Sequence, residues 1–251
     1  MNLIRIVAVL LSIASCSLFV PQDPLSRSLN EHRINTSSGT VQGQFTDQSS
    51  NSAVVSWLDI PYAQPPVAEL RWRAPRSLDT PEAVIETQGD IACVQPASAY
   101  GGASGDNGES IVGSEDCLYL DIRGPADFAT ANYPVMFWIH GGGNITGTKN
   151  YYDYSKLIEG QKVVVVTINY RLGALGWFTH PAVQDLQTGM DSASNFGTLD
   201  IIQALHWVHD NIAKFGGDAN NLTIFGESAG GHNVYSLLAS PLAKGLFHKA
   251  I

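Results

Sequence analysis

Residues 224–232 read Ile-Phe-Gly-Glu-Ser-Ala-Gly-Gly-His, and this stretch decides the fold. A hydrophobic run ends in Gly226, followed by Glu227, Ser228, Ala229 and Gly230. A glycine-x-serine-x-glycine segment between a buried strand and a helix forms a sharp turn that presents the serine hydroxyl. Both glycines are needed because side chains there would strike the strand or helix packed against the turn. The pattern predicts a nucleophilic serine, and its surroundings must support it.

The segments on both sides of Ser228 support a strand, turn and helix. Residues 222–225 are apolar and β-branched, as in a buried strand, and residues 233–239 continue as a helix. The first N–H groups of a helix have no partner within the helix, so they stabilise an anion formed beside them.

A second motif lies upstream, where the strand pattern of residues 134–139 runs into His140, Gly141, Gly142 and Gly143. An acyl-transfer enzyme needs N–H donors for the oxyanion of its tetrahedral intermediate. Only a glycine run lets consecutive N–H groups turn inward without side chains filling the pocket. The alternative is a plain turn with glycines for flexibility, but both motifs in this chain order favour an oxyanion hole.

Strands and helices alternate after residue 117, following a β-rich stretch from about residue 39 to 60 and irregular structure up to 117. Residues 163–168 are continuously apolar and β-branched, as in a strand covered on both faces. Apolar residues recur at helical spacing between Phe196 and Phe215, and two glycines end that helix. The pattern predicts an α/β fold with a mostly parallel central sheet and helices on both faces. The site then lies at the carboxyl edge of the sheet.

From about Thr40 to the last residue, the sequence resembles the type-B carboxylesterases, the carboxylesterase/cholinesterase group of α/β-hydrolases. The resemblance implies an α/β-hydrolase fold in which residues 39–251 are the N-terminal part of the domain and the C-terminal portion is missing. The matching segments, in family order, are DIPYAQPP at 59–66, LRW at 70–72, SEDCLYL at 114–120, NYRLG at 169–173, NFGTLD at 195–200 and FGGD at 215–218.

The resemblance also implies roles for individual residues. It makes Ser228 the nucleophile and the N–H groups of Gly142, Gly143 and Ala229 the oxyanion hole. Glu227 would shape the electric field beside the nucleophile.

Two pairs outside the motifs follow from the same resemblance. It pairs Arg71 with Glu115 in a structural salt bridge and Cys93 with Cys117 in a disulfide.

The sequence departs from the family pattern at a few positions. Asn144 stands where many relatives have an aromatic residue, Ile201 where glutamine is common and Ala219 where proline is usual. The loop between Cys93 and Cys117 contains no tryptophan, whereas cholinesterases use one there to bind a quaternary ammonium. A choline ester is therefore disfavoured as substrate.

The acid and base of a catalytic triad are not found after Ser228. A hydrolase with this motif order places its Asp or Glu and then its His later in the chain. The chain ends at Ile251, and the only candidates beyond Ser228 are His232 and His248. His232 lies four residues on within the turn's own helix, which makes it a weak candidate for the base. We expect the acid and base to lie downstream, and the 251-residue chain alone to be inactive.

The first residues predict export. Arg5 precedes an apolar run too short to span a bilayer, so residues 1–15 are interpreted as a signal peptide and residues 16–38 as a tether. Cys16 ends a lipobox-like segment, which predicts a lipidated cysteine and a bacterial outer-membrane lipoprotein. The alternative is an ordinary signal peptide and a periplasmic or secreted protein. Either reading leaves an even number of cysteines, consistent with one disulfide.

Composition narrows the function classes. A net charge of −9 with only 15% charged residues provides no basic surface for nucleic acid. We therefore predict hydrolysis of small carboxylic esters through an acyl-serine intermediate, with no metal or organic cofactor. The alternative is a catalytically inactive binding or adhesion protein that keeps the fold.

Overall fold

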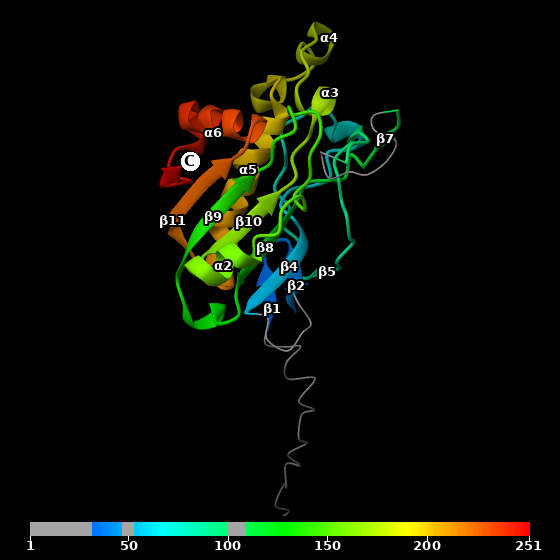
Figure 1. Ribbon diagram of the computed structural model, residues 1–251. Helices are drawn as coiled ribbons and strands as arrows, with labels where there is room; N and C mark the ends of the chain where they lie inside the picture. The colour runs from blue at the N-terminus through cyan, green and yellow to red at the C-terminus, as the bar shows by residue number, and fades with distance from the viewer. Residues whose placement is uncertain (1–31, 47–52, 100–108) are drawn as a thin grey trace, which may run out of the picture. The chain divides into compact units, whose positions relative to one another are not determined.

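A computed structural model of the chain describes residues 32–46, 53–99 and 109–251 (Figure 1). The predicted signal peptide 1–15, the predicted lipidation site Cys16 and most of the predicted tether 16–38 lie outside these residues. Residues 33–36 fall within the range predicted as tether, yet they form strand β1 (Arg33–Thr36), paired antiparallel with β2 (Gly39–Gln42). Regular structure therefore begins ahead of residue 39.

The central sheet has seven strands in the order β12-β11-β9-β10-β8-β4-β3. The last strand of the chain lies at one edge and an early hairpin at the other. In chain order the strands are β3 (Gln44–Phe45), β4 (Val54–Pro61), β8 (Tyr119–Pro125), β9 (Tyr133–Ile139), β10 (Val164–Ile168), β11 (Gly217–Gly226) and β12 (Lys249–Ala250).

The expectation of a mostly parallel sheet is wrong for this part of the chain. Strands β12, β11, β9 and β10 are parallel neighbours, but the pairs β10 with β8, β8 with β4, and β4 with β3 are antiparallel. A parallel connection needs a long crossover, usually a helix. The described residues between β4 and β8, 62–99 and 109–118, contain no α-helix, and β8 pairs antiparallel with β4. The sheet is mixed, with its parallel half on the side of Ser228.

Helices cover both faces of the sheet, as predicted. Strand β10 alternates its side chains: Val163 and Val165 pack in a small cluster with Ile158 of α2 (Ser155–Gln161). Val164 and Val166 face the main core, together with α5 (Phe196–Asn211) and α6 (Ala229–Ala239). Figure 1 shows α2 and α5 on opposite sides of the sheet. A strand buried on both faces explains why residues 163–168 are apolar throughout.

The predicted boundaries need two adjustments. The helix predicted from Phe196 to Phe215 is α-helical to Asn211 and continues as a 3₁₀ turn to Phe215, where Gly216 ends it with φ of 75°. The strand predicted at 222–225 extends back to Gly217 through a register shift. Asp218 makes that shift: its carboxylate accepts the N–H of Asn220 at 2.9 Å, a local turn within the strand.

The remaining elements are short. Strand β5 joins β1 and β2 in a second, three-stranded sheet, and β6 pairs with β7. Among the described residues, no helix is long and apolar enough to cross a membrane. The short elements are β5 (Val84–Ile85), β6 (Gln95–Pro96), β7 (Ile111–Val112), α3 (Gly173–Gly176) and α4 (Pro181–Gln184), with 3₁₀ turns η1 (Ala68–Leu70), η2 (Phe128–Thr130), η3 (Gly189–Ser192), η4 (Ile212–Phe215) and η5 (Pro241–Ala243).

Candidate active site

Ser228 lies between the end of β11 and the start of α6, as the motif predicts. Its backbone has φ of 57° and ψ of −121°, and the residue is exposed. A non-glycine residue in this region stores strain of roughly 1–3 kcal/mol and persists only where the surroundings impose it. The turn therefore holds the hydroxyl out of the fold at the carboxyl edge of the sheet.

The steric need for glycine on both sides of Ser228 is confirmed. A Cβ at Gly226 would overlap the backbone of Gly230 in α6, and one at Gly230 would overlap the carbonyl oxygen of Ile139 at the end of β9. These overlaps involve backbone atoms, which cannot rotate away. Helix α6 is thus packed directly against the ends of two neighbouring strands.

The glycine run lies beside Ser228. Ile139 and Gly226 are register partners on adjacent parallel strands, so the segments that follow them leave the sheet at the same edge. A Cβ at Gly141 would lie 2.7 Å from the carbonyl oxygen of Glu227 and 3.1 Å from the Cβ of Ser228. We call residues 140–147 the oxyanion loop.

The oxyanion loop is a tight turn around the Gly142 carbonyl. The N–H groups of Ile145 and Thr146 both donate to that oxygen at 3.0 Å. Gly142 and Gly143 have φ of 88° and 67°, which glycine adopts without strain. Within the described part of the chain, no backbone hydrogen bond engages the N–H of either glycine. The loop can thus offer both N–H groups to an oxyanion.

A network of polar side chains, which the sequence did not predict, holds the oxyanion loop in place. The Tyr170 hydroxyl donates to the His140 carbonyl at 2.7 Å and lies 3.2 Å from the Asn144 side-chain oxygen. The Asn233 amide of α6 donates to the same Asn144 oxygen at 2.9 Å. Burial raises the pKa of the Tyr170 hydroxyl, so it keeps its proton and remains a donor. Asn144, where many relatives have an aromatic residue, therefore links the oxyanion loop to the helix that follows Ser228.

His140 is a buried, neutral histidine rather than a proton carrier. Its ring stacks on Tyr170 with centroids 4.4 Å apart, and Nδ1 lies 3.0 Å from the Gly141 carbonyl oxygen. Burial lowers the pKa of the imidazole from 6.5 to about 4, although the bond with Gly141 acts in the opposite direction. At neutral pH, Nδ1 carries the proton and donates it to Gly141.

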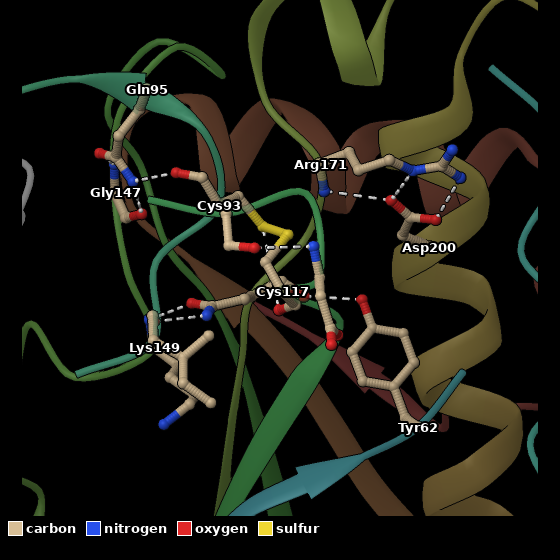
Figure 2. Close-up of a disulfide and its surroundings, with 12 residues drawn as sticks. Tyr62, Cys93, Gln95, Cys117, Gly147, Lys149, Arg171 and Asp200 are labelled. Carbon is tan, nitrogen blue, oxygen red and sulfur yellow. Dashed lines mark hydrogen bonds and ion pairs between the residues drawn. A yellow bond between two sulfur atoms is a disulfide. The ribbon is translucent and has the colours of Figure 1, made fainter. Parts of the chain in front are cut away.

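The disulfide predicted between Cys93 and Cys117 is confirmed (Figure 2). It joins the irregular segment after β5 to the residues that immediately precede β8. The predicted ion pair is also formed: Arg71 donates to both carboxylate oxygens of Glu115 at 2.6 and 2.5 Å. The two side chains are 41% and 25% exposed, so water screens the pair and it contributes little to stability.

The structure does not place a histidine on Ser228. His232 lies exposed on α6, and His248 is engaged with Leu222 in the backbone pairing of β11 and β12. The His232 backbone N–H donates to the Ser228 carbonyl at 3.1 Å, as expected within a helix. Among the described residues, neither histidine ring forms a hydrogen bond with the Ser228 hydroxyl, and no cluster of His, Cys, Asp and Glu could hold a metal ion.

Comparison with known proteins identifies the class. The family model for the carboxylesterase family matches residues 30–251, and the chain belongs to that family. It is 41% identical over 228 residues to carboxylesterase 1D of Rattus norvegicus, which covers 87% of this chain and 39% of the relative. It is 42% identical over 221 residues to the para-nitrobenzyl esterase of Bacillus subtilis (strain 168), covering 87% and 42%.

Solved structures agree with the sequence relatives. A thermophilic PNB esterase superposes with a TM-score of 0.75 at 40% identity, over 88% of this chain and 43% of that one. A carboxylesterase of Geobacillus stearothermophilus gives a TM-score of 0.72, also at 40% identity. The fold is that of the α/β-hydrolases. The chain spans about two-fifths of the length of the relatives that it matches.

Proposed function

We propose that the protein hydrolyses carboxylic esters through an acyl-serine intermediate, with Ser228 as the nucleophile. The observation that carries the proposal is the strained, exposed Ser228 held directly against a glycine loop. Folding alone gives no reason for a serine at a backbone conformation that costs free energy. Membership of the carboxylesterase family and about 40% identity to named esterases support the same reaction class.

The proposed reaction has two displacements. The Ser228 oxygen bonds to the ester carbonyl carbon as its proton passes to a histidine base, and the oxyanion is held by the N–H groups of Gly142, Gly143 and Ala229. The carbon–oxygen bond to the alcohol then breaks, and the alcohol leaves with that proton. Water next attacks the acyl-serine and gives a proton to the same base. The bond between the acyl carbon and the Ser228 oxygen then breaks, the base returns the proton to that oxygen, and the acid leaves.

The histidine base and its acid partner are proposed to be encoded downstream of Ile251. Among the described residues, the rings of His232 and His248 form no hydrogen bond with the Ser228 hydroxyl, so this part of the chain is proposed to supply the nucleophile and the oxyanion donors. Glu227 is proposed to favour the imidazolium that forms during each displacement, because its exposed carboxylate lies at the glycine loop. The reaction as proposed uses only side chains and backbone N–H groups.

Export is proposed on two observations. Residues 6–14 form an apolar run after Arg5, and Cys93 and Cys117 form a disulfide, which persists in oxidising compartments. We propose that Cys16 is lipidated and tethers the protein to a membrane. The intact mass of the exported protein tests this: lipid on Cys16 is expected, and an unmodified N-terminus beyond residue 16 would decide for simple secretion.

The test of the reaction uses the protein expressed from its complete gene. We expect Ser228→Ala to abolish hydrolysis of short-chain aryl esters and covalent labelling by a fluorophosphonate, while the protein still folds. Ser236→Ala is the matched control, because Ser236 lies exposed on α6 and its hydroxyl donates to the His232 carbonyl. Labelling that persists in the Ser228 variant would contradict the assignment. A wild-type protein that neither hydrolyses nor reacts would indicate an inactive binding protein instead.

A further inference from the structure

Gln95 forms three side-chain hydrogen bonds, two of which hold the end of the oxyanion loop (Figure 2). Its side-chain oxygen accepts the N–H of Gly147 at 2.8 Å, and its amide nitrogen donates to the Gly147 carbonyl at 3.0 Å. The same nitrogen donates to the Cys93 carbonyl at 3.0 Å. Gln95 is only 2% exposed, so these bonds face no competition from water. One side chain thus forms hydrogen bonds with both backbone groups of Gly147 and with the backbone carbonyl of Cys93.

The position of Gly147 determines the position of the rest of the oxyanion loop. It has φ of 130°, and a Cβ there would overlap the His140 ring, so the first and last residues of the loop are in contact. The loop is therefore closed at its base. Tyr170 fixes one end, through the His140 carbonyl, and Gln95 fixes the other.

A shift at Gly147 would pass directly to the oxyanion donors. Thr146, the neighbour of Gly147, donates its N–H to the Gly142 carbonyl at 3.0 Å, and Ile145 donates to the same oxygen. Gly142 is thus one hydrogen bond away from the residue next to Gly147. Oxyanion stabilisation depends on donors placed within a few tenths of an ångström of the developing charge, and a misplacement of about 1 Å can lower a rate about 100-fold.

We propose that Gln95 is a positioning residue for catalysis: it sets the place of the oxyanion donors by fixing Gly147 relative to the Cys93–Cys117 disulfide. The inference rests on the proposed esterase function. It differs from a purely structural role, in which Gln95 would satisfy buried backbone groups and affect stability alone. The two roles predict different kinetics.

The experiment uses the protein from its complete gene and the variant Gln95→Met, which keeps the length of the side chain and removes all three hydrogen bonds. We expect kcat for an aryl ester to fall about 10- to 100-fold, with KM changed less than about threefold, because donors to the oxyanion act in the transition state. The inhibition constant of a trifluoromethyl ketone, whose adduct with Ser228 carries an oxyanion, should rise by the factor by which kcat/KM falls.

Gln187→Met is the matched control. Gln187 also bonds a backbone carbonyl, that of Trp72 at 3.0 Å, but it lies outside the oxyanion loop and its supports. We expect its kcat and its affinity for the ketone to match those of the wild-type protein. All assays are run well below the melting temperature of each variant, with circular dichroism confirming the folded state.

A second variant keeps the test decisive if Gln95→Met does not fold. In Gln95→Glu, a neutral carboxylic acid retains the acceptor and one donor, whereas the ionised form places a charge against two carbonyl oxygens. We expect the activity of this variant relative to wild type to rise as pH falls from about 8 to about 6, since burial raises a carboxyl pKa. Variants that melt earlier but keep wild-type kcat and ketone affinity would overturn the inference. An inactive wild-type protein would instead refute the proposed function.

Discussion

At the scale of single residues, the site depends on Gly230, which makes room for the backbone of a neighbouring strand. Gly230 and Gly231 are adjacent on α6 but differ in surroundings: a Cβ at Gly230 would overlap the Ile139 carbonyl, while one at Gly231 would find the Gly226 carbonyl oxygen at 3.6 Å, an ordinary contact. The sequence motif assigns a function to Gly230 and none to Gly231. The same substitution at the two positions therefore separates packing at the turn from general helix effects.

We predict opposite outcomes for Gly230→Ala and Gly231→Ala. The first should destabilise the fold by about 1–3 kcal/mol and lower esterase activity, because α6 must move away from β9 and carry Ser228 with it. The second should leave activity unchanged and stabilise the protein by about 0.5–1 kcal/mol, because alanine restricts the unfolded chain and favours the helix. Urea unfolding and ester assays on both variants provide the measurement. Equal effects at the two sites would contradict the packing account.

The residue scale also shows where prediction from sequence stops. Ser228, Gly142, Gly143 and the disulfide pair could be predicted because short motifs and a family resemblance carry them. Tyr170 and Gln95 could not, because they act on the oxyanion loop from positions 30 and 52 residues away in the chain. No local pattern distinguishes a tyrosine or glutamine that supports a loop from one that lies on the surface.

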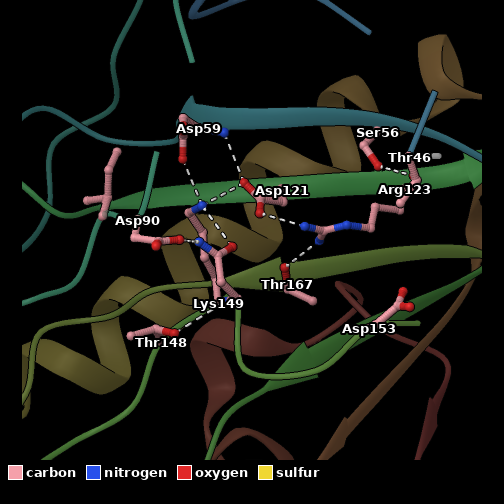
Figure 3. Close-up of polar contacts among 12 residues, drawn as sticks. Thr46, Ser56, Asp59, Asp90, Asp121, Arg123, Thr148, Lys149, Asp153 and Thr167 are labelled. Carbon is pink, nitrogen blue, oxygen red and sulfur yellow. Dashed lines mark hydrogen bonds and ion pairs between the residues drawn. The ribbon is translucent and has the colours of Figure 1, made fainter. Parts of the chain in front are cut away.

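At the scale of elements, a buried ion cluster fixes the chain after the oxyanion loop to the antiparallel half of the sheet (Figure 3). The Lys149 ammonium lies 2.7 Å from an Asp59 oxygen of β4 and 2.8 Å from an Asp121 oxygen of β8, and all three side chains are 1% exposed. The Arg123 guanidinium lies 3.2 Å from the other Asp121 oxygen. This cluster links strands whose antiparallel order the sequence did not predict.

Replacing Lys149 should show how much the buried ion cluster contributes to the free energy of unfolding. We predict that Lys149→Met destabilises the protein by about 3–5 kcal/mol, because two buried carboxylates lose their shared counter-charge. Adding Asp59→Asn to the same variant should recover part of the loss, since Asp59 is the carboxylate left without a cation, whereas Asp121 keeps Arg123. The free energy of unfolding in urea measures both.

Lys156→Met is the control for the lysine substitution. Lys156 lies exposed on α2, where a change of surface charge usually alters stability by no more than about 0.5 kcal/mol. If Lys149→Met were as mild as this control, the cluster would contribute no more than a surface ion pair.

At the scale of the whole molecule, the sequence predicted the α/β class and the helices on both faces but not the mixed order of the sheet. Periodicity identifies strands and helices locally, and the long crossovers through α2 and α5 imply parallel neighbours. The stretch from residue 62 to 118, which connects β4 to β8, has no such periodicity, so the direction of β8 relative to β4 could not be assigned. The part of the fold that carries Ser228 and the glycine run lies in the predictable, parallel half.

The stability of the whole fold against acid should reflect two groups in separate pH windows. His140 has its pKa lowered by burial from 6.5 to about 4. The pKa of Asp191 is lowered from 3.8: burial alone would raise it, but hydrogen bonds from Arg76 and the Ala74 N–H and the charge of Arg76 outweigh burial. In both cases the unfolded chain takes up its proton at a higher pH than the native protein, so stability is lost as pH falls.

We predict that the free energy of unfolding is unaffected by His140 above about pH 6.5, falls by about 3 kcal/mol as pH drops to about 4, and is not lowered further by this group below that. The contribution of Asp191 is fully present above its unfolded pKa of 3.8 and is lost only below it. Urea unfolding at a series of pH values separates the two.

His140→Phe, which keeps the ring against Tyr170, should flatten the dependence of the free energy of unfolding on pH between about pH 6.5 and 4. Asp191→Asn should leave that window intact and flatten the curve below it. If the free energy of unfolding of His140→Phe varied with pH between about 6.5 and 4 as steeply as that of the wild-type protein, His140 would not be the group held neutral by burial.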